Sequence, residues 1–293
     1  MQQKRSPLAG RASRAPLALF LLLALVALVP NSLALRERAG ERVSAAAADW
    51  TIVADGLANP RHLTFGPDGA LYVAEAGAGG ASPCTVGPEG PVCYGPSGAI
   101  TQVEFDADMA PTNQEQVITG LPSLGAEGTG NDAIGPHATA FDGADLYVLT
   151  GLGANPNVRD PGGSLESVGA NFAQLLSTGP GDAFAAWVDI GDYEAAENPA
   201  EDQIDTNPFD LERVTDGYLV VDAGGNALLH VTDAGVITTL ATFPAVMVEF
   251  PPGSGDMVPM DAVPTSVEVG PDGDYYVSQL TGFPFPPGGA SVW

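Results

Sequence analysis

The fold is decided by the stretch PRHLTFGPDGALYVAEAG at residues 60–77, because its design returns three more times along the chain. Each copy begins with a proline-led opening segment, runs into a turn that contains Asp-Gly, and continues as a strand rich in Tyr, Val and Leu. Asp-Gly between apolar runs is a strong β-hairpin signal, since both residues tolerate the dihedrals of the turn. The other copies are PHATAFDGADLYVLTG at 136–151, PFDLERVTDGYLVVDAGG at 208–225 and PTSVEVGPDGDYYVSQ at 264–279.

A supersecondary unit that recurs along a chain indicates a repeat architecture. Further strands are predicted after the hairpins, and four antiparallel strands per repeat is what a β-propeller blade requires. The sequence therefore predicts an all-β fold, a β-propeller of four-stranded antiparallel blades, with one short helix at 192–199. The additional predicted strands cover residues 98–108, 113–121, 170–176 and 183–190, and a further pair lies within 227–243.

The two ends of the repeat region predict an incomplete ring. Residues 290–293, ASVW, are typical of the start of a third strand, so the fourth blade is expected to be cut short. Residues 50–57, WTIVADGL, are typical of an outermost strand that would close such a ring. We expect about four blades, the last one incomplete, from a six-bladed parent. The predicted organisation is a signal peptide at 1–34, a linker at 35–48 and a partial propeller at 49–293.

The first residues have the pattern of a secretory signal peptide. Basic residues from Lys4 to Arg14 precede the apolar run at 16–30, and Ser32-Leu33-Ala34 offers a cleavage site of small residues. The apolar run is shorter than the ~20 residues that span a bilayer, so a cleaved signal is favoured over an uncleaved anchor. We therefore expect a secreted, extracellular protein with no stable membrane insertion after cleavage.

Charge is distributed unevenly along the chain. Seven of the ten basic residues lie within residues 1–48, so residues 49–293 hold three basic residues, Arg61, Arg159 and Arg213, against 34 acidic ones. Such an acidic protein repels nucleic acid and anionic lipid and attracts cations. The charge excludes nucleic acid as a partner and leaves an unknown protein or a small-molecule ligand. It is interpreted first as a solvated acidic surface.

The only two cysteines, Cys84 and Cys93, lie nine positions apart in CTVGPEGPVC. The inner Gly-Pro-Glu-Gly can turn the chain back on itself, and in an exported protein this spacing predicts a local disulfide.

Insertions between the second and third strands of the blades predict a binding face. In a propeller these loops lie on the same side as the connections that lead into each blade, and the Asp-Gly turns lie on the opposite side. Insertions that gather on one side of a repeat protein usually mark its binding face. The candidate ligand-binding residues from these segments are Arg61, His62, Glu75, His137, Asp222, Asn226 and Gln279.

Each candidate also has a structural interpretation. Arg61, His62 and His137 either form a polar ligand or metal site at a channel mouth or bond the backbone of the opening segments. Asp222 and Asn226 either bind a cation or cap the turn DAGGN. Three acidic residues around the third opening segment either bind a cation or belong to a solvated loop: Asp202, Asp205 and Asp210.

The order of these parts resembles the ScyD/ScyE family of exported proteins, which is related to six-bladed propellers of the NHL-repeat and SMP-30-like kinds. The resemblance rests on several segments that span residues 50–293. It implies a fold and a compartment, because the family has no established reaction. The segments include NPRHLTFGPDGALYVAEAG at 59–77, CTVGPEGPVCYGPSGAITQVEF at 84–105, YEAAENP at 193–199 and YLVVDAGGNALLHV at 218–231.

The leading functional hypothesis is a non-enzymatic exported propeller that binds a partner or a small ligand at its loop face. It needs no cofactor. The alternative implied by the SMP-30-like relationship is a metal-dependent hydrolase, lactonase or lyase. In that case Glu75, Asp222 and Asn226 would hold a divalent cation such as Ca²⁺, and His137 would act as acid or base. No motif such as GxSxG or HExxH supports the alternative.

Overall fold

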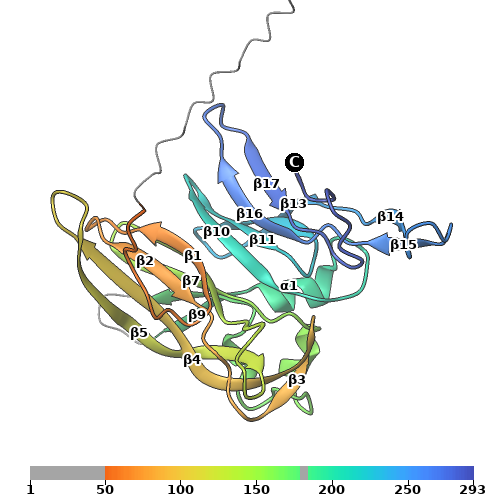
Figure 1. Cartoon of the computed structure of the whole chain (residues 1–293), viewed down its shortest axis with the longest axis horizontal. Helices are drawn as coiled ribbons and strands as arrows, with labels where there is room; N and C mark the ends of the chain where they lie inside the picture. Colours follow the sequence, from red (N-terminus) through yellow and green to blue (C-terminus); the bar gives the residue numbers. More distant parts are fainter. Residues whose placement is uncertain (1–49, 179–183) are drawn as a thin grey trace, which may run out of the picture. The chain divides into compact units, whose positions relative to one another are not determined.

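The structure is a computed structural model that describes residues 50–178 and 184–293. The predicted signal peptide at 1–34 and linker at 35–48 lie outside the described residues. The repeat region, Thr51–Trp293, is one unit whose regular elements are almost all antiparallel strands (Figure 1). Its described part holds one α-helix, α1 (Ile190–Glu197), and two 3₁₀ turns, η1 (Pro156–Arg159) and η2 (Gly169–Asn171). The all-β prediction is confirmed, and α1 covers most of the helix predicted at 192–199.

The first blade is built around one long strand. β1 (Pro60–Phe65), β2 (Leu71–Glu75), β4 (Gly90–Phe105) and β5 (Pro111–Ala126) follow one another across the sheet. An additional strand, β3 (Cys84–Gly87), pairs with the beginning of β4, whereas β2 pairs with its end. The sequence predicted no strand between residues 78 and 97, so β3 and the first half of β4 were missed.

The remaining blades repeat the same order. The second contains β6 (Pro136–Asp142), β7 (Asp145–Thr150), β8 (Gln174–Thr178) and β9 (Ala185–Asp189). The third contains β10 (Pro208–Val214), β11 (Gly217–Asp222), β12 (Ala227–Thr232) and β13 (Ile237–Thr242). The fourth sheet contains β16 (Pro264–Val269), β17 (Tyr275–Gln279) and β18 (Ser291–Val292). This arrangement is the predicted propeller of four-stranded blades with an incomplete fourth blade.

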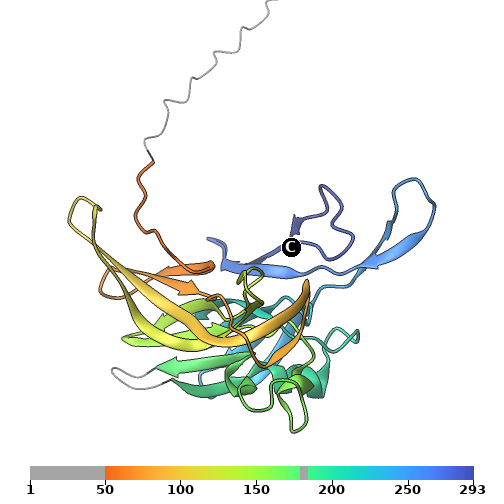
Figure 2. The same ribbon diagram turned by 60° about the horizontal axis from the view of Figure 1, so that its bottom comes forward.

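Between the third and fourth blades lies a hairpin that the sequence did not predict. It consists of β14 (Val246–Glu249) and β15 (Met257–Met260), which pair only with each other. Figures 1 and 2 both show this hairpin projecting beyond the neighbouring sheets.

The Asp-Gly turns fold as the sequence predicts, and two of them share the same side-chain chemistry. In the first blade Asp68 accepts hydrogen bonds from the backbone N–H of Ala70 at 3.1 Å and from the hydroxyl of Tyr72 at 2.9 Å. In the fourth blade Asp272 accepts the equivalent bonds from Asp274 and Tyr276, at 3.2 and 2.8 Å. The glycine that follows each aspartate has a positive φ, +81° at Gly69 and +85° at Gly273, which a side chain would disfavour.

Every opening segment carries an irregularity in its pairing just after the proline. The proline itself pairs with the last residue of the second strand in its blade: Glu75, Thr150, Asp222 and Gln279. These four residues therefore hold equivalent positions in the blades.

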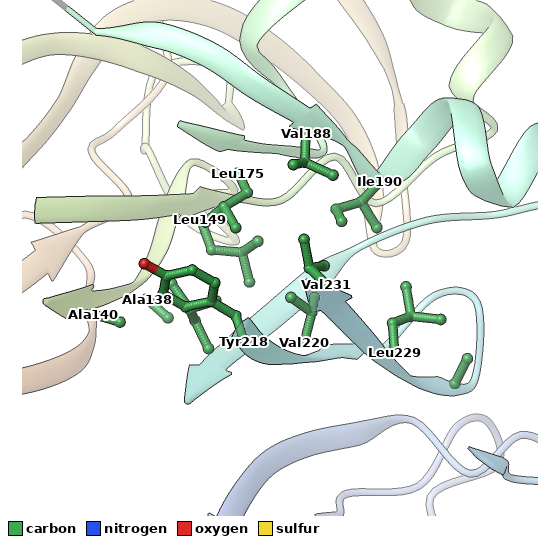
Figure 3. Close-up of a cluster of buried hydrophobic side chains, with 12 residues drawn as sticks. Ala138, Ala140, Leu149, Leu175, Val188, Ile190, Tyr218, Val220, Leu229 and Val231 are labelled. Carbon is green, nitrogen blue, oxygen red and sulfur yellow. The ribbon is translucent and has the colours of Figure 1, made fainter. Parts of the chain in front are cut away.

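Apolar clusters between neighbouring blades hold the unit together. The largest lies between the second and third blades and is shown in Figure 3. Leu149, Leu175 and Val188 of the second blade face Val220 and Val231 of the third (Figure 3). A similar cluster joins the first and second blades, and another joins the third and fourth. Face-to-face burial of this kind explains why the strands are rich in Val, Leu and Ile.

The strand predicted at 50–57 is wrong, since none of these residues lies in a strand. Residues 51–57 are irregular, with Ala54 and Leu57 packed on the apolar cluster of the first blade. The backbone of Asp55 bonds the side-chain amide of Gln114 instead of a neighbouring strand. Because the backbone of Asp55 bonds a side chain, this segment forms no strand ladder.

Each of the three arginines in residues 49–293 makes structural contacts. Arg61 donates to the carbonyl of Ala133 at 2.6 Å. Arg159 bonds Asp189 and Asp192 at 2.9 and 3.0 Å, and its side chain is only 7% exposed. Arg213 of the third blade bonds Asp142 of the second blade and Asp233 of its own blade, both at 3.1 Å.

The predicted disulfide between Cys84 and Cys93 is confirmed. The two cysteines face each other across β3 and β4, so the bond closes the hairpin whose turn holds Pro88 and Glu89. The stabilisation comes mainly from restricting the unfolded chain, and a loop this short gives at most about 3 kcal/mol.

Replacing both cysteines by serine is expected to lower the free energy of unfolding by about 1–3 kcal/mol. Amide hydrogen exchange should increase most in residues 84–93, because the rest of the first blade keeps its own packing. Urea unfolding and exchange of the full chain measure both effects. Unchanged exchange in the hairpin would contradict this role of the bond.

Candidate functional site

Two neighbouring cavities open where the loops of the blades converge. The larger, which we call the acidic cavity, has a volume of about 350 Å³. It is lined by segments of all four blades: Pro88, Glu89, Gly153, Asp205, Asn207, Ala223, Gly224, Asn226, Asp261, Val263, Leu280, Thr281, Gly282, Phe283 and Phe285.

The lining comes from two kinds of segment. Asp205, Asn207, Asp261 and Val263 lead into the third and fourth opening segments, whereas the other lining residues follow second strands of the blades. Because the strands are antiparallel, these segments lie at the strand ends opposite the Asp-Gly turns. The cavity is therefore on the side where the sequence places the insertions.

The cavity wall carries negative charge that has no basic counterpart among its lining residues. Three of those residues are carboxylic acids, Glu89, Asp205 and Asp261. Burial and the nearby carboxylate of Asp222 raise the pKa of Asp205 to about 6, and Asp202 and Asp261 contribute to the increase. One oxygen of Asp205, Oδ1, is buried without a hydrogen-bond partner in the described structure.

A further carboxylic acid lies behind this wall. Glu194 of α1 is only 3% exposed, and its Oε1 has no hydrogen-bond partner among the described residues. Its Oε2 lies 2.8 Å from the point that a Cβ on Gly225 would occupy, between the lining residues Gly224 and Asn226. Burial, followed by the charges of Asp222, Asp202 and Asp205, raises the pKa of Glu194 to about 8. At neutral pH this side chain therefore mostly keeps its proton.

The smaller cavity, of about 130 Å³, holds two of the predicted residues, Arg61 and His137. It shares Pro88, Glu89 and Asn207 with the acidic cavity, so the two form neighbouring compartments. The disulfide hairpin supplies the first two of these residues.

His137 is a buried, neutral histidine. Its Nδ1 lies 2.8 Å from the carbonyl oxygen of Pro208, and its ring packs on Phe209. Burial lowers the pKa of His137 to about 4, so the ring donates Nδ1–H to that carbonyl at neutral pH. The other candidate histidine, His62, lies 3.5 Å from Asp210 of the third opening segment.

The equivalent residues at the ends of two second strands hold the chain that leads into their own blade. Glu75 accepts from the backbone N–H of Ala58 at 2.5 Å and from the side chains of Thr101 and Gln116. Asp222 accepts from the backbone N–H of Asn207 at 2.7 Å. This recurring contact explains why the residues at these positions are polar. The explanation requires no ligand.

The carboxylate of Asp222 already accepts four hydrogen bonds from the protein itself. Besides Asn207, its Oδ1 accepts from the N–H groups of Gly224 and Gly225, both at 3.0 Å. Its Oδ2 accepts from the hydroxyl of Thr206 at 2.6 Å. The capped turn that the sequence offered as one interpretation of DAGGN is present.

The two candidates with amide side chains, Asn226 and Gln279, also form hydrogen bonds within the protein. The Oδ1 of Asn226 accepts from the N–H of Val263 at 3.0 Å, and its amide donates to Asp202 at 3.2 Å. Gln279 accepts from the indole of Trp293 at 2.6 Å. Of the seven candidates, Arg61 and His137 share the smaller cavity, Asn226 lines the acidic cavity, and Glu75 lies beside a separate cavity.

Sequence reasoning missed most of the cavity wall. Glu89, Asp261, Phe283 and Phe285 were not singled out, although the two phenylalanines stand in the conspicuous apolar loop FPFPP at 283–287. Asp210 was expected in a solvated or cation-binding loop. Instead it is 4% exposed and accepts from the N–H of Val267 at 2.9 Å, which ties β10 to β16.

Among the described side chains, no three His, Cys, Asp or Glu residues are grouped closely enough to hold a metal ion. None of the helices in the described ranges is long and apolar enough to cross a membrane.

Comparison with known proteins leaves the function of the chain open. No family model matches the chain, and no curated protein matches it, so the resemblance to the ScyD/ScyE family stays a prediction. A crystal structure from Thermus thermophilus, described as an oxidoreductase (glucose dehydrogenase), is similar over 78% of this chain and 92% of its own. The identity is 15% and the TM-score is 0.33, so this similarity carries no functional argument.

Proposed function

We propose that the chain is a non-enzymatic, exported binding protein of the ScyD/ScyE kind that holds a positively charged ligand in the acidic cavity. One observation carries the proposal: loops of separate blades bring Glu89, Asp205 and Asp261 to one cavity whose lining includes no basic residue. The disulfide is in keeping with an oxidising compartment.

The volume and electrostatics of the cavity support a ligand of molecular size. Pockets that bind small molecules are typically about 300–1,000 Å³, and the acidic cavity falls within this range. The raised pKa of Asp205 reports mutual repulsion among carboxylates as well as burial. A bound cation would offset that repulsion, and the free energy gained would appear as affinity.

Calorimetric titration of the full chain with n-pentylammonium tests the proposal, with n-pentanol as the uncharged control. We expect the ammonium ion to bind and the alcohol not to bind. Replacing Asp205 and Asp261 together by asparagine should weaken binding at least about tenfold, equivalent to about 1.4 kcal/mol.

The matched control replaces Asp106 and Asp108 by asparagine in the turn between β4 and β5, at the opposite ends of the strands. This variant loses the same charge but should bind as the unchanged chain does. Absence of ammonium binding, or equal weakening by both double variants, would overturn the proposal.

A further inference from the structure

An aromatic rim borders the acidic cavity. Phe283 and Phe285, both lining residues, lie in the loop after β17, with their ring centroids 6.2 Å apart and close to perpendicular. Phe250, from the turn after β14, packs against Phe283 with a centroid separation of 4.8 Å. We call these three residues the aromatic rim.

The rim leaves apolar side chains open to solvent. Phe283 is 57% exposed and Phe285 is 55% exposed, and the neighbouring lining residue Leu280 is 60% exposed. Contiguous exposed apolar surface beside a concave site often marks the place where a ligand packs. The acidic cavity therefore offers a ligand both apolar rings and carboxylates.

The segments that carry two of the cavity carboxylates are held in place by backbone contacts. Asp261 bonds the loop through its backbone, because its carbonyl accepts the N–H of Gly282 at 2.9 Å. Asp205 precedes Thr206 and Asn207, both of which are fixed by Asp222. The carboxyl of Glu194, whose Oε1 has no hydrogen-bond partner among the described residues, lies behind Gly225 and adds a buried acid to the same wall.

From this juxtaposition we infer that the ligand is an organic cation with an apolar body. Its charged head, an ammonium or guanidinium group, lies between Asp205 and Asp261, and its body packs on Phe283 and Phe285. The inference rests on the proposed function and specifies the ligand that the cavity accepts.

The physical reason is that a ligand of another class would use only the carboxylates or only the phenylalanine rings. A bare ion would leave the phenylalanine rings in water, and a neutral apolar molecule would leave the carboxylates unpaired. An alkylammonium ion satisfies both, since its methylene groups cover the rings and its head can also lie over an aromatic face.

The experiment compares n-pentylammonium with methylammonium, which has the same head without the body, and with CaCl₂. Calorimetry of the full chain should show pentylammonium binding at least about tenfold more tightly than methylammonium. Replacing Phe283 and Phe285 together by alanine should weaken pentylammonium binding about 2- to 30-fold and leave methylammonium binding nearly unchanged.

The matched control is Phe65→Ala, a substitution of an equally exposed phenylalanine at the Asp-Gly end of β1. Urea unfolding of each variant shows that the comparison is made on folded protein. Nuclear Overhauser contacts between the pentyl methylenes and the Phe283 or Phe285 rings provide a second, independent readout.

The outcomes separate this inference from the proposed function. If pentylammonium and methylammonium bind equally and the phenylalanine variant changes nothing, the organic-cation inference is overturned while cation binding stands. If Ca²⁺ displaces pentylammonium at micromolar concentration, the cavity is a metal site and the inference is wrong. If no cation binds, both fail.

Discussion

At pH 9 the Glu194→Gln variant is expected to be more stable than the unchanged chain by about 3–5 kcal/mol, whereas at pH 5 the two should differ by less than about 1 kcal/mol. The buried carboxyl of Glu194 has a pKa of about 8 in the folded chain, against an ordinary value of 4.5. Glutamine has nearly the same shape but carries no charge at any pH.

The sign follows from which state binds the proton more tightly. A carboxyl whose folded-state pKa is raised favours folding fully below its unfolded value, here 4.5. Its contribution is lost as the pH rises from there through about 8, because the unfolded chain releases the proton first. The glutamine variant lacks this loss, so the difference between the two proteins should grow steadily across that window.

Urea unfolding at pH 5, 7 and 9 measures the effect. The control is Glu197→Gln, on the same helix but exposed, which should behave as the unchanged chain at each pH. A constant difference between the Glu194→Gln variant and the unchanged chain over the whole range would refute the argument. It would mean that the carboxylate is solvated as it ionises.

The second large effect is expected at Asp222. Its replacement by alanine should lower the free energy of unfolding by about 3–5 kcal/mol. The reason is that three backbone N–H groups and the hydroxyl of Thr206 lose their acceptor together. The site is 1% exposed, so water cannot easily replace the carboxylate.

The Asp222→Asn variant isolates the role of the charge. Its remaining oxygen can still accept from the backbone, so the expected loss is about 1–2 kcal/mol. Asp108→Ala, in the exposed turn between β4 and β5, should change stability by no more than about 0.5 kcal/mol. A loss below about 1 kcal/mol for Asp222→Ala would show that the turn finds other acceptors.

The parts of this fold that depend on local chemistry could be predicted from the sequence. The Asp-Gly hairpins follow from the preferences of two residues and an adjacent tyrosine, and the disulfide follows from a spacing of nine with a turn inside it. That Glu75 and Asp222 belong to the loop side of their blades was also visible from the sequence. Their shared role in holding the preceding chain was not, because its backbone donors carry no sequence signal.

The cavity could not be predicted because its wall is assembled from loops of separate blades. Asp205 and Asp261 are 56 residues apart, and Glu89 lies in the turn between β3 and β4, where no strand was predicted before residue 98. Their proximity depends on the packing of whole blades against one another. The same dependence explains why Asp210, which looks like part of a solvated acidic loop, is buried against the next blade.

The contacts of Arg61, Arg159 and Arg213 have a consequence for proteolysis. Trypsin-like proteases cut after Lys or Arg and need several residues of extended, accessible chain around the cut. Residues 49–293 contain no lysine, and Arg61, Arg159 and Arg213 are each held by neighbouring segments. The folded repeat region therefore offers such enzymes almost no substrate, and it becomes one only when the blades separate.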